Sequence, residues 1–266
     1  AIVKDTTDKS MTSGKRIAVP VTILEVPPIK IFSVRFYKNN KVFNEIVVSH
    51  DKDLKRKMKV PKSTIHDLSK IPESYDDIRV IIYTLPKEIS LKKTPDLLEI
   101  ALHAKDKLAF VKSLLTKQIS IADLSKTSLV DVRGVTKGKG FQGPVKRFGI
   151  GLRQHKSEKG VRRPGSIGPW HPAHVTFRTP MAGQLGMFSR TQLNTLLINS
   201  STIQEKDINP ISGFKHYGKI SNAYVLVKGS VQGPPKRQVA LTLAFRPTKT
   251  LSKTKYEFIE LITKTP

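Results

Sequence analysis

RGVTKGKGFQGPVKRFGIGLRQHKSEKGVRRPGSIGPWHPAHVTFRTPMAGQLGMFSR, residues 133–190, is the stretch on which the interpretation of the fold depends. It contains twelve lysines and arginines against one carboxylate, Glu158, together with eleven of the chain's sixteen glycines and its only tryptophan. It contains no apolar run of helical or strand period long enough to bury a face. Because such a segment cannot build a core of its own, we expect it to be disordered or folded against a polyanionic partner.

The composition of this stretch predicts contact with nucleic acid. Lysine and arginine provide positive charge and N–H donors for phosphate oxygens, and glycines let the backbone approach a ribose-phosphate surface without interference from Cβ atoms. The alternative is a solvated basic loop around a buried tryptophan, but such a loop has no need of so many glycines beside one acid. The stretch also holds planar side chains that are able to stack on unpaired bases, namely Arg147, Phe148, Trp170, His171 and Phe177.

The chain as a whole is also basic. Its 266 residues contain 47 Lys and Arg against 21 Asp and Glu, a formal net charge of +26, which far exceeds what solubility requires. An apolar content of 38% is sufficient for a core in one large domain or two modest ones. The absence of cysteine excludes a disulfide framework and a thiolate zinc site, and no apolar stretch approaches membrane-spanning length. We therefore expect a cytoplasmic protein without a signal peptide, with no membrane partner, whose surface faces a polyanion.

Hydrophobic periodicity predicts a mainly β protein with an α/β insertion. The first two expected strands should form an antiparallel pair around Pro27-Pro28. A helix is expected after the N-cap Asp106, and Ser120 with Asp123 resembles the capping box of a second, short helix. Strands on both sides of an insertion predict one barrel that both ends of the chain close. The expected strands are residues 16–25, 29–38, 78–85, 130–135, 224–231, 238–245 and 256–262.

A glycine motif raises the possibility of an enzyme. Residues 138–143, GKGFQG, match the G-x-G-x-x-G pattern of nucleotide-binding loops, and Val145 completes the kinase form. A dinucleotide site needs a helix that opens at the third glycine, and we expect Pro144, with Gly149 and Gly151 behind it, to exclude a regular helix. Neither H-R-D nor D-F-G occurs, which excludes a protein kinase.

Three histidines form the second candidate for chemistry. His171 and His174 have a spacing that metal ligands sometimes show, and His155 is near them in sequence. The nearest carboxylate is Glu158, cysteine is absent, and Pro172 stands between the first two histidines, so further ligands would have to come from far away. No serine or threonine has a base and an orienting acid at motif spacing. We expect no metal site and no catalytic residue.

Six motifs follow one another in one order over nearly the whole chain, so chance is a poor explanation for them. They are VPVTILEVPPIK (19–30), DVRGVTKGKGFQGPVKRFG (131–149), GSIGPWHPAHV (165–175), AGQLGMFSRTQLN (182–194), GFKHYG (213–218) and YVLVKGSVQGPPKR (224–237). In these motifs the chain resembles the archaeal and eukaryotic branch of the large-subunit ribosomal protein family numbered three, and the archaeal type in particular.

The resemblance implies a mostly β fold with an α+β insertion: a closed Greek-key translation-protein β-barrel with an inserted α/β segment and a long basic extended loop. Relatives begin with a further basic arm, so the resemblance also implies that an N-terminal arm is missing here. The expected segments are 1–49 for the first part of the barrel, 50–126 for the α/β insertion, 127–145 for a barrel strand and the entry to the loop, 146–190 for the basic finger, and 191–266 for the remaining barrel strands and C-terminus.

The resemblance further implies a structural constituent of the large ribosomal subunit that binds large-subunit rRNA and supports early subunit assembly. The implied partners are this rRNA and neighbouring large-subunit proteins, with no small-molecule substrate and no cofactor, since structural Mg²⁺ or K⁺ would belong to the rRNA. The expected rRNA-binding residues are Arg133, Lys137, Lys139, Lys146, Arg147, Arg153, His155, Lys156, Lys159, Arg162, Arg163, Arg178, Arg190, Lys236 and Arg237.

In this family the loop that corresponds to residues 154–178 is a finger whose tip approaches the peptidyl transferase centre. The matching tip residues here are Pro169, Trp170, His171 and His174. Chemistry at that centre belongs to RNA, so the resemblance predicts that this chain is not an enzyme. Two alternatives remain from the residues themselves: an architectural or chaperone protein that binds RNA outside the ribosome, and an RNA-acting enzyme that uses the histidines. The scarcity of carboxylates counts against the enzyme.

Overall fold

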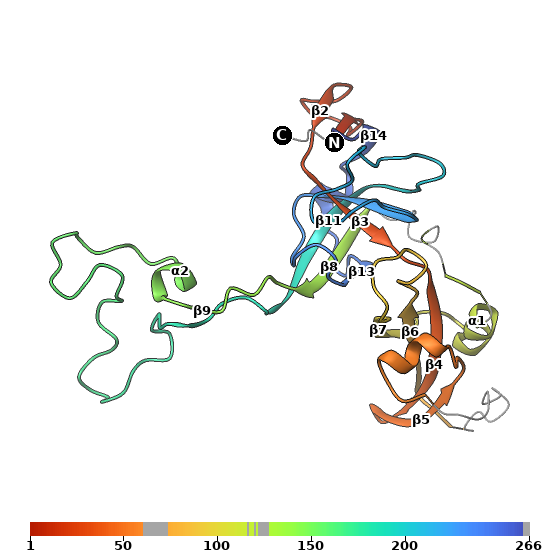
Figure 1. The fold of residues 1–266 in the computed structure, drawn as a ribbon, viewed down its shortest axis with the longest axis horizontal. Coiled ribbons are helices and arrows are strands. Elements are labelled where there is room, and N and C mark those ends of the chain that lie inside the picture. Colours follow the sequence, from red (N-terminus) through yellow and green to blue (C-terminus); the bar gives the residue numbers. More distant parts are fainter. Residues whose placement is uncertain (61–73, 116, 120, 122–127, 263–266) are drawn as a thin grey trace. The chain divides into compact units, whose positions relative to one another are not determined.

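The computed structural model describes residues 1–60, 74–115, 117–119, 121 and 128–262. Strands predominate in this part of the chain and helices are short (Figure 1). The strands are β1 (Ile2–Asp5), β2 (Arg16–Ala18), β3 (Val21–Val26), β4 (Ile29–Lys38), β5 (Lys41–Val47), β6 (Asp77–Thr84), β7 (Leu97–Ala101), β8 (Leu129–Val135), β9 (Phe141–Gln142), β10 (Gly183–Gln184), β11 (Ser189–Thr202), β12 (Ala223–Lys228), β13 (Val239–Leu243) and β14 (Tyr256–Glu260). The helices are η1 (Lys52–Arg56), α1 (Lys107–Leu114), α2 (Pro144–Phe148) and α3 (Lys249–Ser252).

The chain divides into two compact units. The first unit comprises Ala1–Val130, Asn194–Ser230 and Arg246–Pro266, and the second unit comprises Asp131–Leu193 and Val231–Phe245. The second unit therefore contains the whole of the basic glycine-rich stretch, together with the turn that carries the Gly-Pro-Pro sequence.

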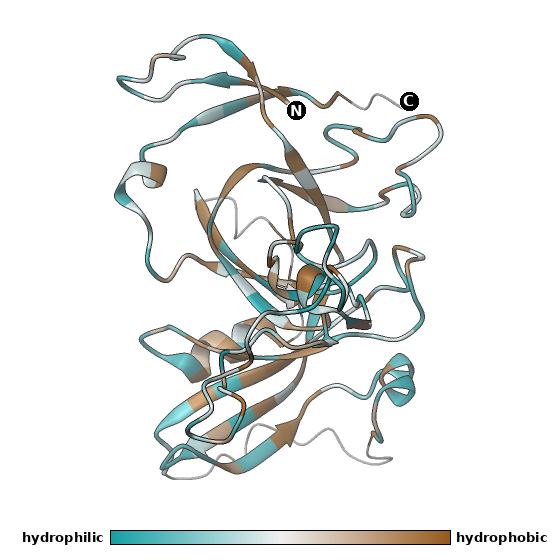
Figure 2. Ribbon diagram, turned by 90° about the vertical axis from the view of Figure 1, so that its left-hand side faces the viewer, coloured by the Kyte–Doolittle hydropathy of each residue, from teal (hydrophilic) through white to brown (hydrophobic). Residues whose placement is uncertain are grey.

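A four-stranded antiparallel sheet in the first unit has the strand order β5-β4-β6-β7. Alternate residues of β4 point to opposite faces, so Val34 and Phe36 join a buried cluster with Ile78 and Val80 of β6. Leu108 of α1 packs against this cluster, and Val111 of the same helix belongs to it. Figure 2 shows the resulting alternation of hydrophobic and hydrophilic residues along the strands of this sheet.

A second sheet has the order β13-β8-β11-β12-β3, and β12 is one of its inner strands. Its residues Ala223–Val227 are all buried, which means that both faces of this inner strand are covered. Tyr224 and Leu226 join another hydrophobic cluster with Val3 and Ile198, which forms the core at this end of the first unit. The four-stranded and the five-stranded sheet thus contribute to separate hydrophobic clusters.

The predicted closed barrel is not formed among the described residues. The strand order of the second sheet ends at β13 on one side and at β3 on the other, so the sheet is open. The ends of the chain do come together, because β1 pairs antiparallel with β14, with Val3 opposite Phe258. These strands pair with each other and with β2 in a separate three-stranded sheet, so they do not close the larger sheet.

The expected hairpin around Pro27-Pro28 is wrong: the expected strand 29–38 is β4, but the expected strand 16–25 is divided at residues 19–20 into β2 and β3, which belong to different sheets. β3 pairs with β12, with Leu24 opposite Val225, and β4 pairs with β5 and β6. Since β4 has neighbours on both edges, it has no free edge for β3. The prolines, which have no N–H to donate, carry the chain from one sheet to the other.

Other local predictions are confirmed. Strands occur at 78–85, 130–135, 224–231, 238–245 and 256–262 with limits that differ by a few residues. The helix after Asp106 is α1, and the Asp106 carboxylate accepts a hydrogen bond from the N–H of Ala109 at 3.1 Å. The predicted capping box at Ser120 and Asp123 lies outside the described residues.

Candidate nucleic-acid interface

All of the predicted rRNA-binding residues lie in the second unit, although they come from two distant parts of the sequence. The side chain of Arg237 joins these parts: its Nη1 donates to the carbonyl oxygens of Thr136 at 2.9 Å and Val135 at 3.4 Å. The Nε2 atom of Gln232 also donates to the carbonyls of Val132 at 2.8 Å and Arg190 at 3.1 Å. The Gly-Pro-Pro turn is therefore tied to the root of the basic loop.

The root of the loop is formed by two antiparallel chain passages. Leu185 N–H donates to Gly140 O and Lys139 N–H donates to Leu185 O, each at 2.9 Å, and β9 pairs with β10 beside them. Gly186 permits this close approach, because a Cβ atom there would lie 1.9 Å from the carbonyl oxygen of Lys137. The φ angle of Gly186 is also +82°, a conformation that side-chain-bearing residues rarely adopt. We call residues 136–149 and 181–188 the neck.

A five-residue helix, α2, begins inside the neck directly after the third glycine of the G-x-G-x-x-G match, which is its N-cap, and this corrects the prediction that a regular helix is excluded here. Pro144 is the first helical residue, where the missing N–H has no intrahelical partner to lose and the proline φ angle fits a helix. Gly149, with φ +70°, ends the helix in the left-handed conformation. A helix this short, after a two-residue strand, does not provide the strand–turn–helix unit of a dinucleotide site.

The predicted cations differ in how their side chains are used. Lys137, Lys139 and Lys146 are exposed, whereas Arg147 and Arg237 are half-buried. Arg147 donates from Nη1 to the carbonyl of Met181 at 2.9 Å and from Nε to that of Gln184 at 3.1 Å. The remaining predicted cations and His155 are exposed, namely Arg133, Arg153, Lys156, Lys159, Arg162, Arg163, Arg178, Arg190 and Lys236.

Beyond α2 the chain forms a long irregular loop with no helix or strand before β10 (Figure 1). Short polar contacts shape it: Nη2 of Arg153 donates to the carbonyl of Pro164 at 2.7 Å, and the hydroxyl of Thr179 donates to the carbonyl of Ile167 at 2.9 Å. Trp170 is 86% exposed, with its ring 6.4 Å from that of His171 in a T-shaped arrangement. The tryptophan is therefore not a core residue in this structure.

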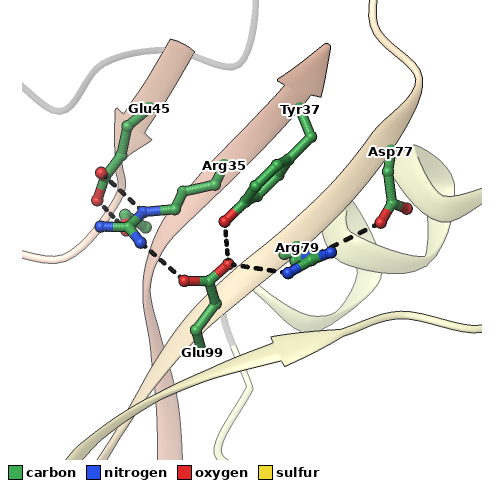
Figure 3. Close-up of polar contacts among 7 residues, drawn as sticks. Arg35, Tyr37, Glu45, Asp77, Arg79 and Glu99 are labelled. Carbon is green, nitrogen blue, oxygen red and sulfur yellow. Dashed lines mark hydrogen bonds and ion pairs between the residues drawn. The ribbon is translucent and has the colours of Figure 1, made fainter. Parts of the chain in front are cut away.

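In the first unit some of the charged residues form a network of ion pairs. On one face of the four-stranded sheet, Nη1 of Arg35 lies 2.8 Å from Oε2 of Glu99, and its Nε lies 2.9 Å from Oε2 of Glu45 (Figure 3). Tyr37 donates to Glu99, and Arg79 lies beside the same carboxylate. The hydrogen bond from Tyr37, with help from the two arginines, lowers the pKa of Glu99, and the same hydrogen bond raises the pKa of Tyr37.

The described residues offer no metal site. No group of three or more His, Asp or Glu side chains among them is arranged to hold a metal ion, and His171 and His174 are both exposed. No helix in the described part of the chain is long and apolar enough to cross a membrane.

Comparison with known proteins settles the family. The sequence model of the family described as ribosomal protein L3 matches residues 35–264. The chain belongs to the ribosomal protein L3 family. It is 42% identical over 270 residues to the large ribosomal subunit protein uL3 of Methanocaldococcus jannaschii, covering 95% of this chain and 80% of that protein. It is also 40% identical to uL3 of Methanococcus vannielii and 39% identical to uL3 of Archaeoglobus fulgidus, with 94% and 93% of this chain and 79% of each relative covered.

These relatives are archaeal, which confirms the archaeal type implied by the sequence motifs. The L3 family consists of structural proteins, so the histidine-based enzyme is rejected. Sequence reasoning missed Gly183 and Gly186, whose role depends on contacts within the neck. The only signal for them in the sequence is the pair of glycines in AGQLGMF, residues 182–188, which accompanies the earlier glycine-rich run at residues 138–143.

Proposed function

We propose that the exposed cations of the second unit bind large-subunit rRNA, in a chain that is a structural constituent of the large ribosomal subunit and not an enzyme. The observation that carries the proposal is the near absence of carboxylates in the second unit, which holds 14 lysines and arginines against two, Asp131 and Glu158, whereas the first unit holds 33 against 19. Neighbouring large-subunit proteins are further partners, and the place of action is the large subunit in the cytoplasm.

Binding of this kind is mainly electrostatic. Lysine and arginine side chains replace the counterions around phosphates, so affinity comes from counterion release and falls steeply with salt. The deep major groove of duplex RNA is closed to side chains, so recognition depends on phosphates, 2′-hydroxyls and shape, with stacking at unpaired bases. The exposed rings of Phe141, Trp170 and Phe177 are available for such stacking.

We assign the irregular loop as an extension that enters folded rRNA. Its lack of an apolar face and its many cations support this assignment, because RNA would supply the packing surface that the loop does not have. The resemblance of the element PWHPAH, residues 169–174, to that of the family supports a position of the tip near the peptidyl transferase centre. There the protein would hold RNA geometry, while the RNA carries out the reaction. A support of early subunit assembly is part of the same proposal.

The proposal is tested by measuring the salt dependence of binding between the full chain and large-subunit rRNA. The variant replaces Lys137, Lys139 and Lys146 with Ala, since all three are exposed in the neck. If each contacts one phosphate, the slope of log K against log salt should fall by about 0.7–0.9 for each lost contact. The matched control replaces three exposed lysines of the first unit, Lys4, Lys41 and Lys253, and so removes the same charge.

The proposal is supported if the slope of log K against log salt becomes clearly less steep for the neck variant and changes less for the control. Equal slopes for the neck variant and the unmodified chain would show that these lysines face solvent in the complex. Equal losses for both variants would mean that overall charge, and not the neck, determines binding.

A further inference from the structure

We infer that Arg147 is a positioning residue, not a phosphate ligand: it locks the neck and so sets the direction in which the basic loop leaves the neck. The inference deepens the proposed function, because the loop it positions is the one assigned to rRNA. Its own basis is the geometry of the protein alone, so its first test needs no RNA.

The side chain of Arg147 bridges two parts of the chain that lie more than thirty residues apart. Arg147 belongs to α2, and its Nη1 and Nε donate to the carbonyl oxygens of Met181 at 2.9 Å and Gln184 at 3.1 Å. Those two carbonyls flank the start of β10, so the guanidinium holds the returning chain against the helix. The planar fork of arginine suits two acceptors at once, which a single lysine ammonium does not reproduce.

Gly183 is the second half of this contact. A Cβ atom at Gly183 would lie 3.0 Å from both Cζ and Nη1 of Arg147, closer than ordinary van der Waals contact allows. The backbone of Gly183 is not in the left-handed region, so its need for glycine comes from the guanidinium and not from its φ angle. The absence of a side chain at Gly183 thus leaves the space that the Arg147 guanidinium occupies.

The neighbouring lysine provides a natural contrast. Lys146 is on the same short helix and is exposed, whereas Arg147 is half-buried, with its Cζ atom 5.0 Å from the centre of the Phe148 ring. Two N–H donors of Arg147 are already used by carbonyl groups of the protein. Of the two adjacent cations, Lys146 is the more available to a phosphate, because it is more exposed and its side chain donates to no carbonyl of the described residues.

The test measures amide hydrogen exchange in the free full-length chain. Arg147→Lys keeps the charge but removes the two-acceptor bridge, and we expect exchange at the neck amides of Lys139 and Leu185 to become about tenfold faster or more. Amides of β4, β6 and β12 in the first unit should be unchanged, which shows that the protein is still folded. Lys146→Ala is the matched control and should leave the neck amides as they are.

A second variant tests the contact between the two residues. Gly183→Ala, in a chain that keeps Arg147, places a methyl group about 3.0 Å from the guanidinium, which must shift by a few tenths of an ångström, so exchange at the same amides should rise, but less than in Arg147→Lys. In an Arg147→Ala background it should have little further effect, because its obstacle is gone. If Gly183→Ala raised the exchange rate of these amides by the same factor in the Arg147→Ala background, the assigned contact would be overturned.

Binding to rRNA separates this inference from the proposed function. Arg147→Lys should weaken binding about threefold to tenfold with an unchanged salt slope, since a loosened loop must be ordered on binding and no phosphate contact is lost. Normal neck exchange in Arg147→Lys, with a lower slope in Arg147→Ala, would show that Arg147 is a phosphate ligand and would reject the inference. An unchanged slope in the Lys137, Lys139 and Lys146 variant would reject rRNA binding by the neck lysines and leave the inference about Arg147 intact.

Discussion

The two units of this protein use their charged residues in opposite ways. In the first unit Arg35, Arg79 and Glu99 form a network of ion pairs on a sheet whose other face is a hydrophobic cluster. In the second unit Arg147 and Arg237 donate to backbone carbonyls and neighbouring lysines stay exposed. A carbonyl satisfies an arginine's N–H groups without neutralising its charge. The second unit is thus stabilised in part by its arginines while it keeps the positive field that attracts a polyanion.

The difference also concerns where hydrophobic stabilisation comes from. The first unit buries large side chains such as Phe36, Tyr83 and Tyr224 almost completely, whereas the loop of the second unit exposes Trp170 and Phe177. An unfolding measurement should therefore respond to the first set of residues, and an RNA-binding measurement to the second. If the effects described below are not observed, this contrast between buried stabilising residues and exposed binding residues is wrong.

The largest effect is expected from Phe36→Ala. Phe36 is 0% exposed and lies in the cluster of the four-stranded sheet, so the truncation leaves a cavity and should lower the free energy of unfolding by about 3–5 kcal/mol. Chemical denaturation of the full chain measures it. Phe177→Ala removes the same atoms from an exposed position and should cost less than about 0.5 kcal/mol. Similar losses for both variants would remove the contrast between the units.

A smaller effect, on binding alone, is expected from Trp170→Ala. Because the indole of Trp170 is 86% exposed and does not belong to a buried cluster, the unfolding midpoint of the variant should stay close to that of the unmodified chain. Loss of stacking on an unpaired base should weaken the interaction with large-subunit rRNA by about 1–3 kcal/mol. A titration with rRNA and a denaturation curve on the same preparation give both numbers. Marked loss of stability with normal binding would instead place this tryptophan in a core.

The smallest effect is expected from Glu99→Gln and should depend on pH. The pKa of Glu99 is lowered in the folded chain by its hydrogen bond from Tyr37 and by Arg35 and Arg79. A lowered pKa adds stability that is complete above the ordinary value of 4.5 and is lost as the pH falls towards the folded-state value. Since these side chains are partly exposed, the variant should lose only about 0.5–1 kcal/mol at neutral pH.

This prediction is checked by denaturation at several pH values. The difference between Glu99→Gln and the unmodified chain should shrink as the pH falls below about 4.5. A difference that is constant with pH would mean that the carboxylate charge is not what stabilises the network. Glu257→Gln changes an exposed carboxylate of β14 and serves as the control, with little change expected at any pH.

Several features followed from the sequence alone. The basic stretch with its glycines predicted an irregular, exposed, cationic region, because no apolar periodicity was present to bury it. Strands such as β6 and β12 and the helix α1 were predicted because period, length and an N-cap are local properties of the chain. Six ordered motifs were sufficient to predict the family.

Only the tertiary structure decided which segments meet. The alternation of apolar residues places Leu24 and Val34 on strands and shows which side chains share a face. Hydrogen-bond partners, however, come from segments far apart in sequence, so neither the pairing of β3 with β12 nor the open second sheet was predictable. Composition likewise marks Arg147 as a cation without telling whether its donors meet phosphates or carbonyls. That choice depends on the approach of Gly183 and the carbonyls of Met181 and Gln184, a contact made only when the chain returns through the neck.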